Sequence, residues 1–224
     1  MTMSLAPADN RAESLCAAAV EALCARLCHD LASPVGAVAN GVELLQDVGG
    51  GDGEIIQLLA HAAGEASRRL AYFRLAFGIG GDRDSQRTAV DLRDVAAAWL
   101  ESGRLTFAWP DAEQVADFDR VTAKLILNMI GVAAAVMPFG GTLEVHAAGG
   151  PAAEFSLAMG AERLVADGPV MLVATGAATG EATPETVQAH LAAVLAARLG
   201  GRLALRSGSG GLHHLVFQSE APGT

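Results

Sequence analysis

One histidine has neighbours that could support chemistry. His29 opens the segment His29–Pro34, which reads His-Asp-Leu-Ala-Ser-Pro. Neutral imidazole is a good nucleophile near neutral pH because its unperturbed pKa is about 6.5. Attack on an activated phosphoryl group needs little from the protein beyond alignment and neutralisation of charge. We therefore take His29 as the candidate nucleophile.

The residues around this histidine suggest supporting roles. Asp30 could hydrogen-bond and orient the imidazole, and Arg26, one helical turn earlier, could pair with phosphoryl oxygens. Ser33 is small and leaves the ring accessible, whereas Pro34 removes a backbone donor and should kink the helix. Asn40 follows the histidine by eleven residues, about three turns, so both can share one face. Asn40 is thus a candidate for a docking surface or an ordinary solvated residue.

The first eighty-one residues predict a helical hairpin. Apolar residues recur at gaps of three and four through residues 12–47 and again through residues 55–77. The glycine-rich stretch 48–53 between them cannot continue a helix. Two antiparallel helices cannot enclose a core alone, and a second copy is the simplest partner. We expect residues 1–81 to form a dimeric four-helix bundle. The stripe on the first helix consists of Leu23, Leu27, Leu31, Val35, Val38, Val42 and Leu45.

Residues 82–224 predict a second, α+β domain after a polar linker at 82–88. Strands mingled with helices, some of the strands hairpin-linked, favour a sandwich with helices on one face of the sheet. We expect helices near 91–101, 119–136 and 184–199, and strands near 104–109, 142–147, 153–159, 170–174, 202–206 and 213–218.

Composition excludes several classes of function. The chain carries 15 basic and 25 acidic residues, a formal charge of −10, which is a poor surface for nucleic-acid phosphates. No apolar stretch is long enough to span a bilayer, and the N-terminus lacks the pattern of a signal peptide, so we expect a cytoplasmic protein. Cys24 and Cys28 precede His29, but a closed zinc site needs four ligands and no second cluster is evident. We expect no metal and free thiols.

The segment His29–Pro34 resembles the H box of two-component histidine kinases, and its place on the first helix of a hairpin also matches. The rest of the chain looks like a degenerate kinase ATP-binding domain: Leu127–Thr142 is similar to the N box and the turn and strand after it, and Leu199–Phe217 to the closing elements. Two departures stand out. Val132 occupies the place of a second magnesium-binding asparagine, and Val173–Gly180 lacks the acid of the Asp-x-Gly-x-Gly box.

This combination most resembles the dimeric histidine phosphotransferases of the alphaproteobacterial cell-cycle phosphorelay, with His29–Leu45 as the specific part of the match. The resemblance implies that His29 is the phosphoacceptor and that the helices around it dock receiver domains. Phosphoryl would arrive from the receiver of a hybrid kinase and leave to the aspartate of a downstream regulator. Magnesium would come with the receiver, and the chain would need no cofactor of its own.

Two other interpretations stay open at this point. The chain could be an ATP-dependent histidine kinase with divergent nucleotide boxes. It could also be a non-enzymatic adaptor whose kinase-like domain only binds receivers.

Overall fold

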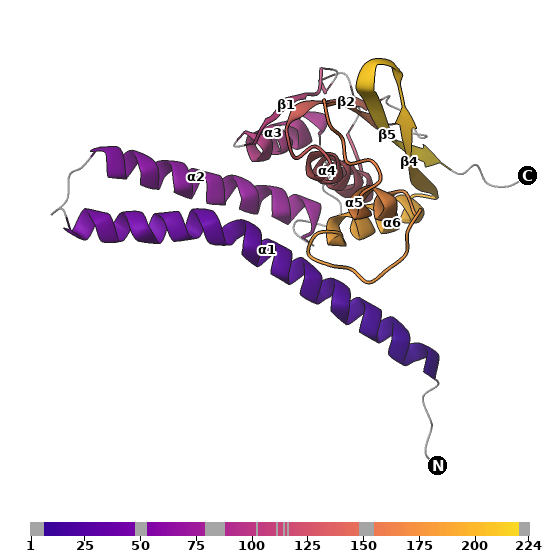
Figure 1. The fold of residues 1–224 in the computed structure, drawn as a ribbon, viewed down its shortest axis with the longest axis horizontal. Helices are drawn as coiled ribbons and strands as arrows, with labels where there is room; N and C mark the ends of the chain where they lie inside the picture. The colour runs from indigo at the N-terminus through magenta and orange to yellow at the C-terminus, as the bar shows by residue number, and fades with distance from the viewer. Residues whose placement is uncertain are drawn as a thin grey trace, which may run out of the picture.

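The chain folds into a long helical hairpin followed by a five-stranded sheet with helices packed against it (Figure 1). The computed structural model describes residues 7–47, 53–78, 88–101, 103–110, 112–113, 115, 117–147 and 155–219, with side chains described from residue 17 onward. The predicted glycine-rich turn 48–53 and linker 82–88 lie outside the described residues, apart from Gly53 and Thr88.

The predicted hairpin is confirmed. Helix α1 (Pro7–Asp47) runs beside α2 (Gly53–Ala76) and continues past its end, with a bend in its middle that is visible in Figure 1. Pro34 lies inside α1, where its ring and missing N–H disfavour a straight helix. A Cβ atom on Gly41 would lie 2.7 Å from Cδ2 of Leu59, so glycine lets the two helices approach closely here.

The sheet is mixed, with strand order β1-β2-β3-β5-β4. Strand β1 pairs parallel with β2, and the remaining pairs are antiparallel. Along β2 the apolar Leu143 and Val145 are fully buried, whereas Glu144 and His146, which alternate with them, have exposed side chains. One face therefore packs against helices, as the sequence predicts. The strands are β1 (Leu105–Ala108), β2 (Gly141–Ala147), β3 (Phe155–Gly160), β4 (Gly201–Ser207) and β5 (Leu212–Ser219).

Helix α4 (Arg120–Ala135) is the centre of the helical layer. It is buried over most of its length and contacts helices on several sides. Asp119 caps its start, since the carboxylate accepts hydrogen bonds from the backbone N–H groups of Val121 and Thr122. The other helices of this layer are α3 (Ala89–Leu100), α5 (Pro169–Ala174) and α6 (Val187–Arg198).

The predicted strand at residues 170–174 is wrong, because this segment forms the short helix α5. Pro169 stands in its first turn, where a missing N–H costs nothing. In a short, continuously apolar segment, the periodicity of hydrophobic residues cannot distinguish a buried strand from a buried helix. Packing against α6 and α4 favours the helix. The helix ends before Gly176, whose φ of 74° lies in the left-handed region.

The end of α2 is part of the same core as α4, so the hairpin is anchored to the α+β domain. Tyr72 is fully buried; its hydroxyl donates to the Leu127 carbonyl (2.7 Å) and accepts from Nε2 of Gln188 (2.9 Å). Its ring stacks on Trp99 with centroids 4.1 Å apart. One side chain thus joins α2 to three other helices.

A buried amide secures the same junction. Nδ2 of Asn128, which is fully buried, donates to the carbonyls of Ala76 (3.0 Å) and Lys124 (2.8 Å). Nζ of Lys124 in turn donates to the Phe77 carbonyl. Carbonyls at the end of a helix have no partner within the helix, and here α4 supplies the donors.

We expect Tyr72→Phe to lower the free energy of unfolding by about 1–3 kcal/mol, because Gln188 loses its buried acceptor. Urea denaturation monitored by circular dichroism measures this.

Burial raises the pKa of Tyr72 above its ordinary value of 10.0. Above about pH 10 the Tyr72 phenol ionises in the unfolded chain but stays protonated in the folded chain. The free energy of unfolding of the wild type therefore falls as pH rises, and Tyr72→Phe lacks this part of the pH dependence.

Tyr72 is the only tyrosine in the chain, so tyrosinate absorbance reports it alone. In the wild type this signal should rise together with unfolding at alkaline pH. A tyrosinate signal that appears near pH 10 in a fully folded protein would contradict the burial described above.

Candidate functional site

His29 lies on the surface of α1 with its ring available to a partner. Its side chain is 88% exposed. Nδ1 lies 3.2 Å from Oδ1 of Asp30, within hydrogen-bond distance. When Nδ1 carries the proton and donates it to this carboxylate, Nε2 keeps its lone pair and is the nucleophilic atom. The neighbour expected to orient the ring is thus in contact with it.

Asp30 is itself held from two sides. Its carboxylate lies 3.6 Å from Nε of Arg26, and its backbone carbonyl accepts a hydrogen bond from Nη1 of Arg69 on α2. In a regular helix this carbonyl would accept from the residue four positions later, which is Pro34 and has no N–H. Arg69 therefore supplies the donor that the proline removes.

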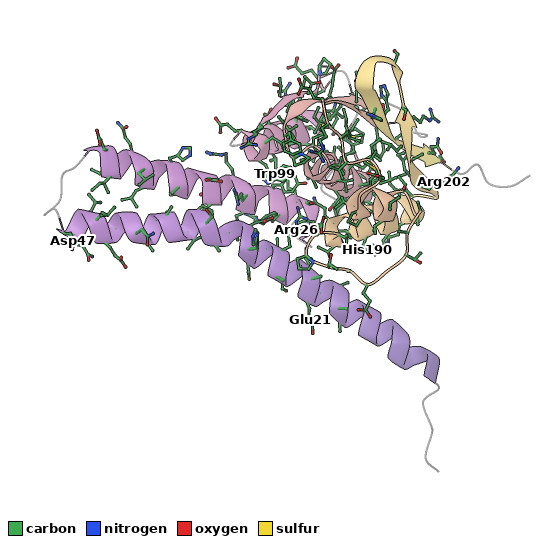
Figure 2. The ribbon with its side chains drawn as sticks, viewed as in Figure 1. Glu21, Arg26, Asp47, Trp99, His190 and Arg202 are labelled. Atoms are coloured by element: carbon green, nitrogen blue, oxygen red, sulfur yellow. The ribbon has the colours of Figure 1, made fainter. Side chains whose placement is uncertain are left out.

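Arg26 is in contact with the loop before α6. Its Nη1 donates to the carbonyls of Pro184 and Glu185, both at 3.3 Å, and its side chain is only 18% exposed. Figure 2 shows it where α1 passes the α+β domain. The predicted contact with phosphoryl oxygens is not formed in this arrangement and stays a prediction.

Two other predicted residues share the surface with the histidine. Ser33 and Asn40 are exposed, and spacings of four and eleven residues from His29 are close to whole numbers of turns. Pro34 is buried and acts through the helix backbone instead. His29, Ser33 and Asn40 therefore form one accessible polar face, which we call the His29 face.

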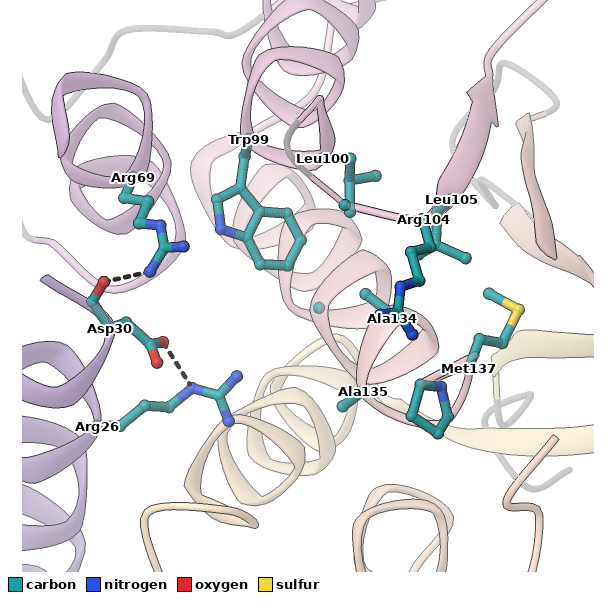
Figure 3. Close-up of a pocket in the computed structure, with 13 residues that line it drawn as sticks. Arg26, Asp30, Arg69, Trp99, Leu100, Arg104, Leu105, Ala134, Ala135 and Met137 are labelled. Atoms are coloured by element: carbon teal, nitrogen blue, oxygen red, sulfur yellow. Dashed lines mark hydrogen bonds and ion pairs between the residues drawn. The ribbon is translucent and has the colours of Figure 1, made fainter. Parts of the chain in front are cut away.

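Sequence reasoning missed Arg69 and the cavity beside it. The only signal was Pro34, which leaves a carbonyl in need of a donor but does not say which residue provides it. The cavity has a volume of about 470 Å³ and lies between the hairpin and the α+β domain (Figure 3). Arg26, Asp30 and Arg69 form its hairpin side.

The positions that resemble kinase nucleotide boxes are occupied by packing contacts. The amide nitrogen of Asn128 binds the end of α2, and Val132 is buried without an oxygen to offer. Nε2 of Gln188 would lie 2.0 Å from a Cβ on Gly131, so α6 sits directly against α4. This donor set does not fit a magnesium-bound nucleotide.

Metal ligands do not gather elsewhere in the part of the chain that the structure describes. No group of three or more His, Cys, Asp or Glu side chains there could hold an ion. Cys24 and Cys28 are free and exposed. No helix among the described residues is long and apolar enough to cross a membrane.

Comparison with known proteins identifies relatives. Residues 89–210 match the model of the histidine phosphotransferase C-terminal domain. Protein phosphotransferase ChpT of Brucella abortus is 39% identical over 127 residues, which are 57% of this chain and 59% of that protein. The chain thus aligns with little more than half of this relative. A bacterial phosphotransferase solved at 1.7 Å is 28% identical, with a TM-score of 0.74 over 96% of this chain and 98% of that one.

We expect Arg69→Met to lower the free energy of unfolding by about 1 kcal/mol, since the Asp30 carbonyl loses its donor while the aliphatic packing is kept. Arg74→Met is the matched control, because Arg74 is exposed on the same helix. Urea denaturation compares the two variants. Equal stability of both would show that the contact with Asp30 contributes nothing.

Proposed function

Because this chain belongs to the histidine phosphotransferase family, we propose that it relays a phosphoryl group between receiver-domain aspartates through a phosphohistidine at His29. The observation that carries the proposal is the exposed imidazole whose Nδ1 is held by Asp30. The Brucella relative carries the name of a protein phosphotransferase, which agrees with this role.

The geometry supports a simple transfer step. A receiver docks on the His29 face and presents its aspartyl phosphate. Nε2 of His29 attacks phosphorus, an N–P bond forms, and the bond from phosphorus to the aspartate oxygen breaks, which releases the carboxylate. The Nδ1 proton stays on the ring, where the Asp30 carboxylate offsets the positive charge that develops. The reverse step passes the group to a second receiver, and magnesium belongs to the receiver.

We propose receivers rather than ATP as the source of the phosphoryl group. A kinase needs a nucleotide pocket, but here Asn128 is committed to α2 and Gln188 packs against Gly131. Val132 offers no ligand to a hard cation. These contacts favour the carrier role over the ATP-dependent kinase.

We also propose that the hairpin pairs with a second copy of the chain, in the cytoplasm. Its apolar side chains are exposed to an extent that is unusual for a monomer. On α1 the stripe has gaps of three and four residues, which mark one face of a long helix and are close to those of a coiled-coil seam. The exposed apolar residues of the hairpin are Val20, Val35, Val42, Leu44, Ile56, Leu58 and Leu70.

The first test is transfer from a phosphorylated receiver in the absence of ATP. We expect acid-labile, alkali-stable label on the wild type and none on His29→Gln, because that side chain lacks the nucleophilic nitrogen. His61→Gln, also an exposed histidine on the hairpin, should be labelled normally. Since His29 is exposed, its replacement should change stability by no more than about 0.5 kcal/mol.

Other outcomes favour the other functions. Label on His29→Gln would reject His29 as the carrier. Label that requires magnesium-ATP would identify a kinase. Receiver binding without any transfer would identify an adaptor.

For the dimer, Val42→Glu should shift the mass measured by light scattering from two chains to one, because the change buries a charge in the seam. Leu212→Glu places the same charge on an exposed apolar residue outside the hairpin and should leave the mass unchanged. A wild type that is monomeric at micromolar concentration would contradict the proposed pairing.

A further inference from the structure

The cavity between the hairpin and the α+β domain has the size of a ligand site. Its volume of about 470 Å³ lies in the range of small-molecule pockets, about 300–1,000 Å³, and exceeds what a bare ion needs. Gly103, Gly131, Ala134 and Ala135 line part of it, and their small side chains leave the space open.

Positive charge converges on this cavity although the chain as a whole is acidic. Three arginines and one aspartate line it, against a formal charge of −10 for the whole sequence. Figure 3 shows Arg26 on one side and Arg104 on the other, both directed into the space. An anion that entered would meet guanidinium groups from α1 and from the start of β1.

These arginines have donors to spare. Arg69 is occupied by the Asp30 carbonyl and by Glu65. Nε of Arg26 is buried and makes no hydrogen bond in the described residues; the Asp30 carboxylate lies 3.6 Å away. Within the same residues, the guanidinium of Arg104 has neither a hydrogen bond nor an ion pair. Arg104 is exposed, so the cost of an unpaired buried donor applies to Nε of Arg26, where a ligand oxygen would relieve it.

Apolar side chains line the cavity beside Arg104. Trp99 lines the cavity with one face of its indole already stacked on Tyr72, and Met137 and Leu105 lie further along. Apolar walls with a few convergent polar groups are typical of sites for small organic molecules.

We propose that this cavity binds a small organic phosphate, with the phosphate between Arg26 and Arg104 and the organic part against Trp99 and Met137. A phosphate monoester brings a charge of about −1.5 to −2 and three acceptor oxygens. A carboxylate brings one charge and two oxygens, and Asp30 already provides one here. His29 does not line this cavity, although Asp30, which contacts its ring, does. The proposal concerns ligand binding and does not depend on phosphoryl transfer.

Calorimetry on the full chain tests the site with AMP, adenosine and inorganic phosphate as probes. We expect AMP to bind at one site per chain. Adenosine, which lacks the phosphate, and inorganic phosphate, which lacks the organic part, should each bind at least about tenfold more weakly. Arg104→Met should weaken AMP binding by at least about tenfold, because a charge-assisted contact is lost.

Two controls separate this site from the rest of the molecule. Arg206→Met changes an exposed arginine on β4 that does not line the cavity and should bind AMP as the wild type does. His29→Gln should also bind AMP normally, which keeps this result independent of the relay. Absence of AMP binding at millimolar concentration, binding unchanged in Arg104→Met, or equal binding of AMP and either other probe would overturn the proposal.

Discussion

The buried hydroxyl of Tyr72 is the constraint on which the arrangement of the chain depends. A phenol removed from water needs hydrogen-bond partners, and here they come from α4 and α6. Because Tyr72 belongs to α2, satisfying this group fixes the hairpin against the α+β domain. The stack on Trp99 adds α3 to the junction. The cavity exists because these elements are held at this separation.

A second set of contacts links Pro34 to His29, the candidate nucleophile. Pro34 leaves the Asp30 carbonyl without its helical donor, and Arg69 on α2 provides one. The backbone of Asp30 is thereby tied to α2, while its carboxylate contacts Nδ1 of His29. The orientation of the exposed imidazole thus depends on the packing of the hairpin. Helix geometry, packing and chemistry are linked through these four residues.

In the α+β domain, two positions of the segment that resembles a kinase N box make packing contacts. Asn128, at the position that resembles a kinase magnesium ligand, donates to the Ala76 carbonyl at the end of α2. Gly131 lets Gln188 approach α4 at a distance that any Cβ would forbid. These side chains thus pack α4 against α2 and α6.

The sequence by itself determined the features that depend on local spacing. The period of apolar residues predicted both hairpin helices, and the His29–Pro34 segment pointed to His29 as the candidate nucleophile and to its contact with Asp30, because these residues lie within a turn or two of helix. Most strands of the sheet followed from the alternation of residues and from the turns between them. Contacts between residues far apart in the chain left no such pattern.

Only the tertiary structure decided those distant contacts. Arg69 meets Asp30 across 39 residues, and Gln188 meets Tyr72 across 116, so no local spacing could pair them. The same holds for Arg26, which donates hydrogen bonds to the loop before α6. The segment 169–174 became a helix because its neighbours in space are helices, which its own apolar residues do not specify. The spacing of apolar residues determines where helices and strands form, whereas the hydrogen bonds of polar groups buried between them determine how they pack together.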